Sequence, residues 1–127
     1  AADGRAAYHA AAVLASNHLV ALQATALRTM SGAGVSPEDA WRLLWPLVAG
    51  TLANLEAGPV PGSLTGPVAR GDAGTVQRNL RALDGDPSAA AVYAALSMEA
   101  LALARKAGLP EERAEALEEI LARAQAG

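Results

Sequence analysis

The chain contains no cysteine and no phenylalanine, and only 3% of its residues are aromatic. The lack of cysteine excludes disulfide bonds and thiolate metal sites. The net charge is −3, and the chain has neither a basic run nor a set of stacking aromatics, so we expect no nucleic-acid partner. Residues 1–7 lack the order of regions that marks a signal peptide, and no apolar run reaches about 18 residues without a polar interruption. We therefore expect a cytoplasmic protein that does not enter a membrane.

Small apolar side chains, alanine above all, supply most of the 52% of residues that are hydrophobic. Small side chains let helix axes approach closely, and no segment alternates apolar and polar residues as a half-buried strand does. A chain of 127 residues is long enough for one domain with one core. The sequence therefore predicts a single all-α domain over residues 1–127. We expect a compact bundle of about five helices with a long, central and buried first helix.

Capping residues and glycines divide the chain into five predicted helices. Serine, aspartate and proline stand at the expected helix starts, and glycine follows the expected helix ends. Pro46 lies inside the second helix, and we expect a kink or break near residues 44–45 because proline cannot donate to the helical ladder. Residues 57–71, rich in glycine and proline, are expected to form a rigid loop. The predicted helices cover residues 5–30, 36–55, 72–83, 87–107 and 110–125.

The predicted first helix is apolar on nearly every side, yet it contains His9, Ser16, Asn17 and His18. A helix that is apolar all round is normally buried, and a buried polar group without a partner costs about 1–3 kcal/mol. At about 100° per residue, Ser16 lies within roughly 20° of His9, Asn17 lies about 80° away, and His18 points to the opposite face. His9 and Ser16 then line one wall of an elongated pocket. The alternative is that His9 packs near the helix start and Ser16 bonds back to a carbonyl one turn earlier.

A second candidate site is the segment LTGPVARGD at residues 64–72, which ends where a helix is expected to begin. Thr65, Arg70 and the backbone amides nearby suit an anionic group. The alternative is a rigid turn in which Arg70 pairs with Asp72 or with backbone carbonyls. No metal site is expected, because the two histidines point to opposite faces of their helix and lack the His-x-x-x-His spacing.

Three segments, in this order, resemble one family: YHAAAVLASNHL at residues 8–19, PLVAGTLANL at 46–55 and LTGPVARGD at 64–72. They are similar to the C-terminal helical domain, itself a domain of unknown function, of a Rossmann-like oxidoreductase family. That family is similar to pyrroline carboxylate reductase and ketopantoate reductase, within the phosphogluconate-dehydrogenase-like group. The resemblance spans nearly all of the chain and implies a fold like the phosphogluconate dehydrogenase C-terminal domain.

The resemblance also implies a two-domain protein. An N-terminal Rossmann domain, expected to be absent from this chain, would bind NAD or NADP, and no cofactor is expected in the chain itself. The helical domain would form a homodimer and one side of a cleft for a small-molecule substrate, either an oxo acid or an imine, with ketopantoate as one candidate. The chain alone is then expected to be an inactive part of an NAD(P)-dependent reductase.

The related dehydrogenases place a lysine four residues before an asparagine on the first helix of this domain. Here Val13 stands four residues before Asn17, so the usual proton-donating lysine is missing. His9 lies one turn further back and is the substitute donor that the resemblance suggests. The remaining expected substrate contacts are Ser16 and Asn17, which would orient the substrate, and Thr65 and Arg70, which would bind its carboxylate.

An alternative from a different class is a standalone homodimeric interaction module without catalysis. The alanine-rich helices favour it, as do Trp41 and Trp45, which are four residues apart on one helix and suit core or interface anchors. A homodimer is expected under either hypothesis. The first helix is apolar on nearly every side, and the other helices of one chain form little more than one layer around it, so a second copy is expected to cover the rest.

Overall fold

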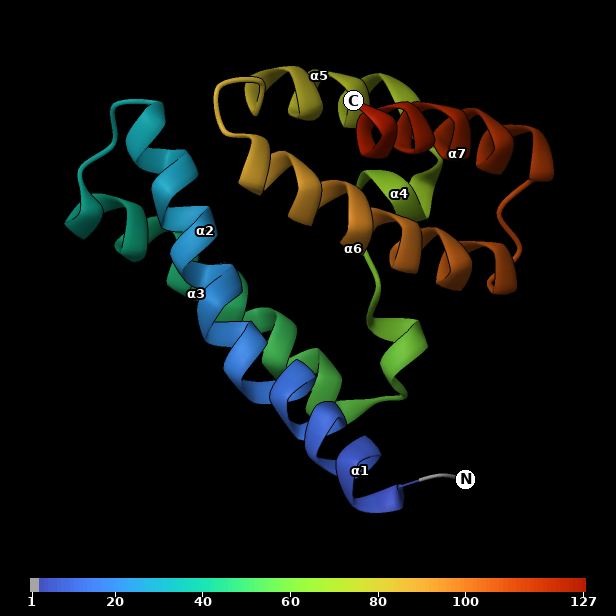
Figure 1. The fold of residues 1–127 in the computed structure, drawn as a ribbon, viewed down its shortest axis with the longest axis horizontal. Helices are drawn as coiled ribbons and strands as arrows, with labels where there is room; N and C mark the ends of the chain where they lie inside the picture. The colour runs from blue at the N-terminus through green and yellow to red at the C-terminus, as the bar shows by residue number, and fades with distance from the viewer. Residues whose placement is uncertain (1–2) are drawn as a thin grey trace. The chain divides into compact units, whose positions relative to one another are not determined.

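The computed structural model describes residues 3–127, and every regular element in that range is a helix. The predicted all-α class is therefore confirmed (Figure 1). The first helical run consists of α1, a π-helical turn η1 and α2, which follow one another without a break. The elements are α1 Gly4–Ala12, η1 Val13–Asn17, α2 His18–Gly32, α3 Pro37–Ala57, the 3-10 helix η2 Val60–Ser63, α4 Pro67–Arg70, α5 Ala73–Ala82, α6 Pro87–Lys106 and α7 Glu111–Ala126.

Side-chain caps explain where most of these helices begin. The Asp72 carboxylate accepts a hydrogen bond from the Thr75 amide at 3.1 Å and starts α5. The Asp86 carboxylate accepts one from the Ala89 amide, also at 3.1 Å, and starts α6. At the start of α3, the Ser36 hydroxyl accepts from the Asp39 amide at 3.3 Å. These caps satisfy amides that have no partner within the helix, and they confirm the predicted helix starts.

Two local predictions are wrong. The expected kink or break near residues 44–45 is wrong as a break, because helix α3 runs through Pro46 as one element. Proline leaves the Arg42 carbonyl without its helical donor, but both residues are exposed, so water can replace that donor. Residues 57–71 are also not a plain loop, because they contain η2 and α4.

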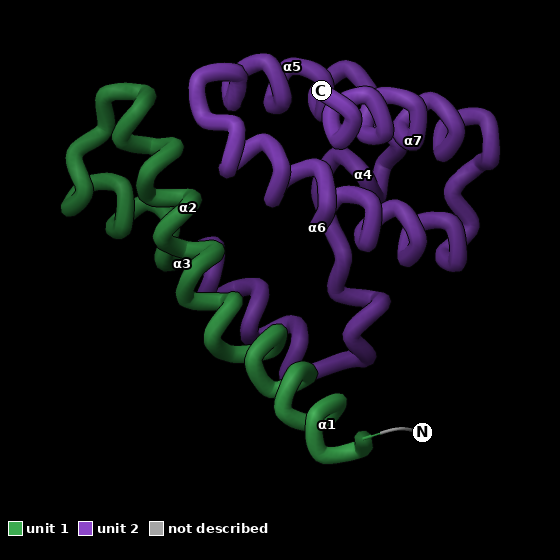
Figure 2. The backbone as a smooth tube through the Cα atoms, viewed as in Figure 1, with its two compact units in different colours: residues 1–46 green, residues 47–127 purple. Residues whose placement is uncertain are grey.

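The chain divides into two compact units, residues 1–46 and 47–127, which are coloured separately in Figure 2. The second unit holds a continuous apolar core in which α6 packs against α7 and α4, and α5 packs against α7 and α4. Seven buried residues form this core, and Leu101, Leu117, Leu121 and Val76 are its largest fully buried side chains. Polar links reinforce it: the Arg105 guanidinium of α6 pairs with Glu111 and Glu118 of α7.

Position 71 in the second unit requires glycine. It ends α4 in the left-handed region at φ +70°. A Cβ atom there would lie 2.8 Å from the Arg113 side chain and 2.9 Å from that of Leu109. Only glycine combines that backbone conformation with so close an approach, so Gly71 allows α4 and the start of α7 to pack together.

The first unit has no comparable core. Ala40 is its one buried residue within residues 3–46, and no residue of α1, η1 or α2 is buried. Large apolar side chains instead lie open, with Tyr8 80%, Val20 71% and Leu14 66% exposed. The prediction of a buried first helix is therefore wrong for the single chain. Its apolar pattern requires cover that the helices of this unit do not supply.

Two helical segments are long and apolar enough to cross a membrane by length and composition alone: Gly4–Gly32 and Pro87–Lys106. The second of these is α6, whose inner face forms part of the core of the second unit. Core helices of soluble proteins and N-terminal signal sequences have the same composition, so this property does not assign either segment to a membrane.

Candidate functional site

Four polar residues of the first helical run are exposed and make no side-chain hydrogen bonds to any of residues 3–127. They are His9, Ser16, Asn17 and His18. Nearby hydroxyls behave differently: Thr25 and Thr29 donate to the carbonyls of Ala21 and Thr25, four residues earlier, at 3.1 and 3.0 Å. The alternative in which Ser16 bonds back into its own helix is therefore wrong. Its hydroxyl and the three neighbouring polar groups remain available to a ligand or partner.

A π-helical turn, η1, interrupts the first helical run at these polar residues. The His18 amide donates to the Val13 carbonyl, five residues earlier, instead of four as in an α-helix. The turn accommodates one extra residue, so every later residue is displaced by about 100° relative to an unbroken α-helix. His18, the first residue after the turn, then lies about 80° from the His9 direction. The predicted face of His18, opposite to His9, is therefore wrong.

The signal for this turn was present in the sequence but weak. Ser16, Asn17 and His18 are three consecutive residues with below-average helix propensity inside an alanine-rich run. Such a run lowers the stability of a regular α-turn, but it does not specify a π turn. π turns often occur at functional sites, which makes this turn the first candidate site of the chain.

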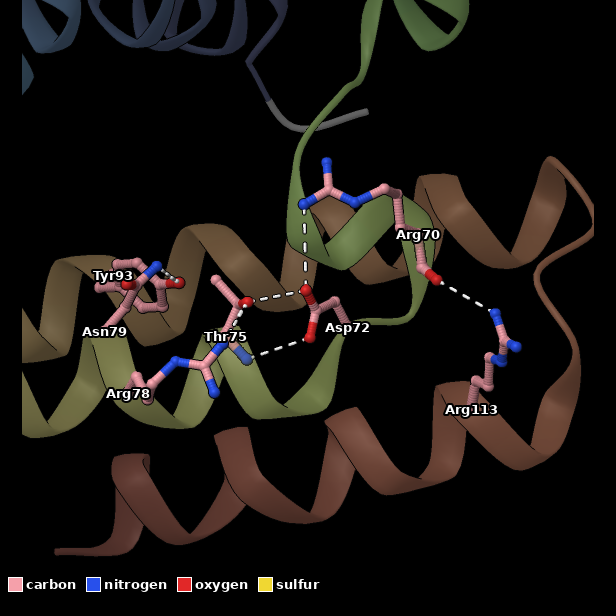
Figure 3. Close-up of polar contacts among 7 residues, drawn as sticks. All are labelled: Arg70, Asp72, Thr75, Arg78, Asn79, Tyr93 and Arg113. Atoms are coloured by element: carbon pink, nitrogen blue, oxygen red, sulfur yellow. Dashed lines mark hydrogen bonds and ion pairs between the residues drawn. The ribbon is translucent and has the colours of Figure 1, made fainter.

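The loop before α5 holds the second predicted group of residues. Arg70 lies at the end of α4, and its guanidinium is 4.0 Å from the Asp72 carboxylate (Figure 3). The structure therefore shows the alternative that the sequence left open, in which Arg70 pairs with Asp72. Thr65 is exposed and makes no side-chain hydrogen bond within the described residues.

Asp72 is the centre of a small polar network. Its carboxylate accepts hydrogen bonds from the Thr75 hydroxyl at 2.7 Å and from the Thr75 amide at 3.1 Å. These two bonds, the hydroxyl first, lower the pKa of Asp72 below its ordinary value, and the charges of Arg70 and Arg78 act in the same direction. Asp72 is therefore a carboxylate at neutral pH, and it neutralises part of the charge of Arg70.

Two further arginines stand beside this network and were missed in the sequence. Arg78 donates to the Thr75 hydroxyl oxygen at 2.9 Å, and Arg113 donates to the Arg70 carbonyl at 3.4 Å (Figure 3). Arg78 follows Thr75 by three residues, and Thr75 follows the capping Asp72 by three, so helical spacing offered a signal for it. Arg113 comes from α7, 43 positions further along the chain than Arg70, and only tertiary packing brings it there.

The predicted site residues thus fall into both units. His9, Ser16 and Asn17 belong to the first unit, whereas Thr65 and Arg70 belong to the second. Each set presents exposed polar groups, and within the second set only Arg70 has a charged partner.

The second unit also has an open groove of about 790 Å³ that the sequence did not suggest. Leu80 and Ile120 are among the apolar residues that line it, and Arg81 and Arg123 are among the polar ones. None of the predicted site residues contributes to this groove. Within residues 3–127, no group of three or more histidine, aspartate or glutamate side chains is placed to hold a metal ion.

The elements and exposed surfaces described above define an all-helical domain with one well-packed unit and one apolar unit that needs cover. The chain belongs to the family described as a domain of unknown function, DUF2520, whose model matches residues 1–100. No curated protein and no solved structure matches the chain.

Proposed function

We propose that this chain is the dimerisation and substrate-binding domain of an NAD(P)-dependent reductase that acts on a small oxo acid or imine. The observation that carries the proposal is the first helical run, which exposes His9, Ser16 and Asn17 without partners on an otherwise apolar surface. Polar groups held on an apolar surface orient a ligand without competing internal bonds. The resemblance of three segments to reductase-associated helical domains gives the reaction class.

The cofactor would be held elsewhere in the full-length protein. Residues 3–127 contain no strand, so they do not supply the strand–glycine turn–helix unit that binds a dinucleotide pyrophosphate. This domain would instead provide the substrate side of the site and the subunit contact. The chain alone is accordingly proposed to be inactive.

The proposed roles follow from the chemistry of each side chain. The His9 side chain would donate a proton to the substrate, because a histidine ring can act as a general acid. Ser16 and Asn17 would orient the substrate through hydrogen bonds. Thr65 and Arg70 would bind the substrate carboxylate, for which Arg70 would exchange its 4.0 Å contact with Asp72 for a closer charge-assisted pair.

The homodimer is proposed from the uncovered apolar surface of the first unit. Tyr8, Leu14 and Val20 are largely exposed on the first helical run, at 80%, 66% and 71%. Trp41 and Trp45 on α3 are also accessible, and their rings are 5.9 Å apart. Apolar and aromatic residues of this kind are typical of the centre of a subunit interface.

The test is a kinetic assay on the full-length gene product. Oxidation of NADH and NADPH is followed with a panel of 2-oxo acids and cyclic imines. We expect His9→Ala to lower kcat by about 100-fold or more. Arg70→Ala is expected to raise KM by roughly 10-fold or more.

Arg123→Ala is the matched control for the charge change, because Arg123 is exposed and, within residues 3–127, pairs only with Glu119 of its own helix. It should leave both constants near those of the wild type. Unchanged turnover in both His9→Ala and Arg70→Ala, in an active full-length enzyme, would show that the site assignment is wrong.

The second candidate function is a standalone homodimeric module without catalysis. The same exposed apolar face favours it, because such a face needs a partner whether or not a substrate binds. The genomic sequence upstream of residue 1 separates the two functions. An in-frame strand–glycine turn–helix region supports the reductase, and a start codon near residue 1 supports the standalone module.

A further inference from the structure

We propose that the open groove of the second unit binds a small apolar zwitterion, an amino acid of the class of leucine. The Arg81 guanidinium binds the ligand carboxylate, the Asp84 carboxylate binds the ligand ammonium group, and the apolar lining covers the aliphatic side chain. This site is separate from that of the proposed function, because none of the residues assigned to the reductase site lines the groove.

The groove exists because small residues stand where three helices come together. Its lining comes from α5 and the turn after it, from the first turns of α6 and from the end of α7, and its volume is about 790 Å³. Ala90, Ala91 and Ala124 belong to that lining, and alanine has no side chain beyond Cβ to fill the space. Small-molecule sites measure about 300–1,000 Å³, so the groove is large enough for a whole amino acid.

The core of the second unit holds the apolar part of the lining in place. Leu80 and Ile120 are half-buried and pack against that core, and Leu83 is only 8% exposed. Each of these side chains still has part of its surface in the groove. A ligand that covers this surface removes apolar area from water, which favours an aliphatic side chain over a polar one.

Three charged side chains line the groove: Arg81, Asp84 and Arg123. Arg123 already pairs with Glu119 of its own helix. Arg81 and Asp84 are exposed, and neither forms an ion pair or a side-chain hydrogen bond with any of residues 3–127, including each other. The groove therefore offers one free cation and one free anion beside an apolar surface.

These two free charges select the ligand class. A fatty acid would pair with Arg81 but would bring its carboxylate close to the carboxylate of Asp84, and an alkylamine would meet the opposite conflict at Arg81. A zwitterion avoids both conflicts, because a guanidinium donates to carboxylate oxygens and a carboxylate accepts from an ammonium group. Apolar amino acids carry both charges and an aliphatic side chain, so they match all three parts of the lining.

The experiment is an NMR titration of the isotope-labelled 127-residue chain with leucine, 4-methylpentanoate and 3-methylbutylamine. The second probe is leucine without the ammonium group, and the third is leucine without the carboxylate. We expect leucine to shift the backbone amide signals of Ala90, Ala91 and Ala124 with a Kd on the order of 1 mM. We expect it to bind about 3-fold or more tightly than either of the other probes.

Two charge variants assign each half of the ligand to its partner. Arg81→Gln should weaken the binding of leucine and 4-methylpentanoate by about 3-fold or more and should not weaken that of 3-methylbutylamine. Asp84→Asn should weaken the binding of leucine and 3-methylbutylamine by a similar factor and should not weaken that of 4-methylpentanoate. A general loss of structure would affect all three probes alike, so the crossed pattern identifies direct contacts.

Two further variants test the groove itself. Ala91→Trp places a large ring in the groove and should weaken leucine binding by about 10-fold or more. Ala95→Trp is the matched control, because Ala95 is exposed one turn further along α6 and does not line the groove. It should change leucine binding by less than about 2-fold. Circular dichroism checks that both variants keep their helix content.

Four results would overturn the proposal. The first is the absence of shifts in the groove signals up to about 20 mM leucine, and the second is equal affinity for the three probes. The third is an equal loss of leucine binding in Ala91→Trp and Ala95→Trp. The fourth is a groove covered by a second copy of the chain, in which case Ala91→Trp would shift the sedimentation equilibrium toward monomer while leucine left the groove signals unmoved.

Discussion

Replacing Val20 by glutamate tests whether a second copy of the chain covers the first unit. Val20 lies on α2 and is 71% exposed in the single chain. Burying that exposed part in an interface contributes about 1 kcal/mol. A two-fold dimer buries the residue in both subunits, which gives about 2 kcal/mol, or roughly a 30-fold change in the dimer Kd. A buried carboxylate adds a desolvation cost, so 30-fold is the lower limit.

The assay is sedimentation equilibrium over a range of protein concentrations, with circular dichroism to confirm that the variant stays helical. The matched control is Leu96→Glu, which places the same charge at a 48% exposed apolar position of α6 in the second unit. We expect Val20→Glu to shift the equilibrium toward monomer and Leu96→Glu to leave it unchanged. A wild-type mass of 12.8 kDa at all concentrations, or a Val20→Glu Kd within about threefold of the wild-type value, would refute the reasoning.

Three further predictions concern the second unit. Leu117→Ala should lower the free energy of unfolding by about 2–5 kcal/mol in urea denaturation, because Leu117 is fully buried, whereas Leu96→Ala should change it by less than about 1 kcal/mol. Gly71→Ala should lower the midpoint of thermal unfolding, because alanine would have to adopt φ +70° and its methyl group would lie 2.8 Å from the Arg113 side chain. An unchanged midpoint would contradict the packing described. Asp72→Asn should reduce the loss of folding stability that the protein undergoes in acid. The pKa of Asp72 is lowered below 3.8 in the folded state, so its contribution to stability is present above that value and lost as the pH falls through the folded pKa. Urea unfolding midpoints of the variant and the wild type, measured between pH 3 and pH 7, test this difference in pH dependence.

The parts of the fold that local chemistry decides were predicted well. The Asp72 and Asp86 caps and the helices that follow them depend on residues within one turn of each other. The long loop was predicted less well. Its short helix α4 ends at Gly71, and that end is held by Arg113 and Leu109 from a distant segment.

The candidate site shows the same division. The segment Ser16–His18 was recognised as unusual because polar residues stand in an apolar run. The predicted direction of His18 was wrong, because the π hydrogen bond from the His18 amide changes the register of the residues after the turn. The sequence left open whether Arg70 pairs with Asp72 or binds an anion, and the structure places its guanidinium 4.0 Å from the Asp72 carboxylate.

The sequence by itself determined that this protein is all-helical and where most helices begin, because caps, glycines and helical periodicity act over a few residues. Its apolar pattern also showed that the first helical run needs cover on most sides. Only the tertiary structure decided which residues receive that cover within the chain. The second unit closes a core around Leu101, Leu117 and Leu121, whereas the first unit leaves Tyr8, Leu14 and Val20 open. The burial of a side chain depends on which helices pack against it, and the sequence of one segment does not show which distant segment it will contact.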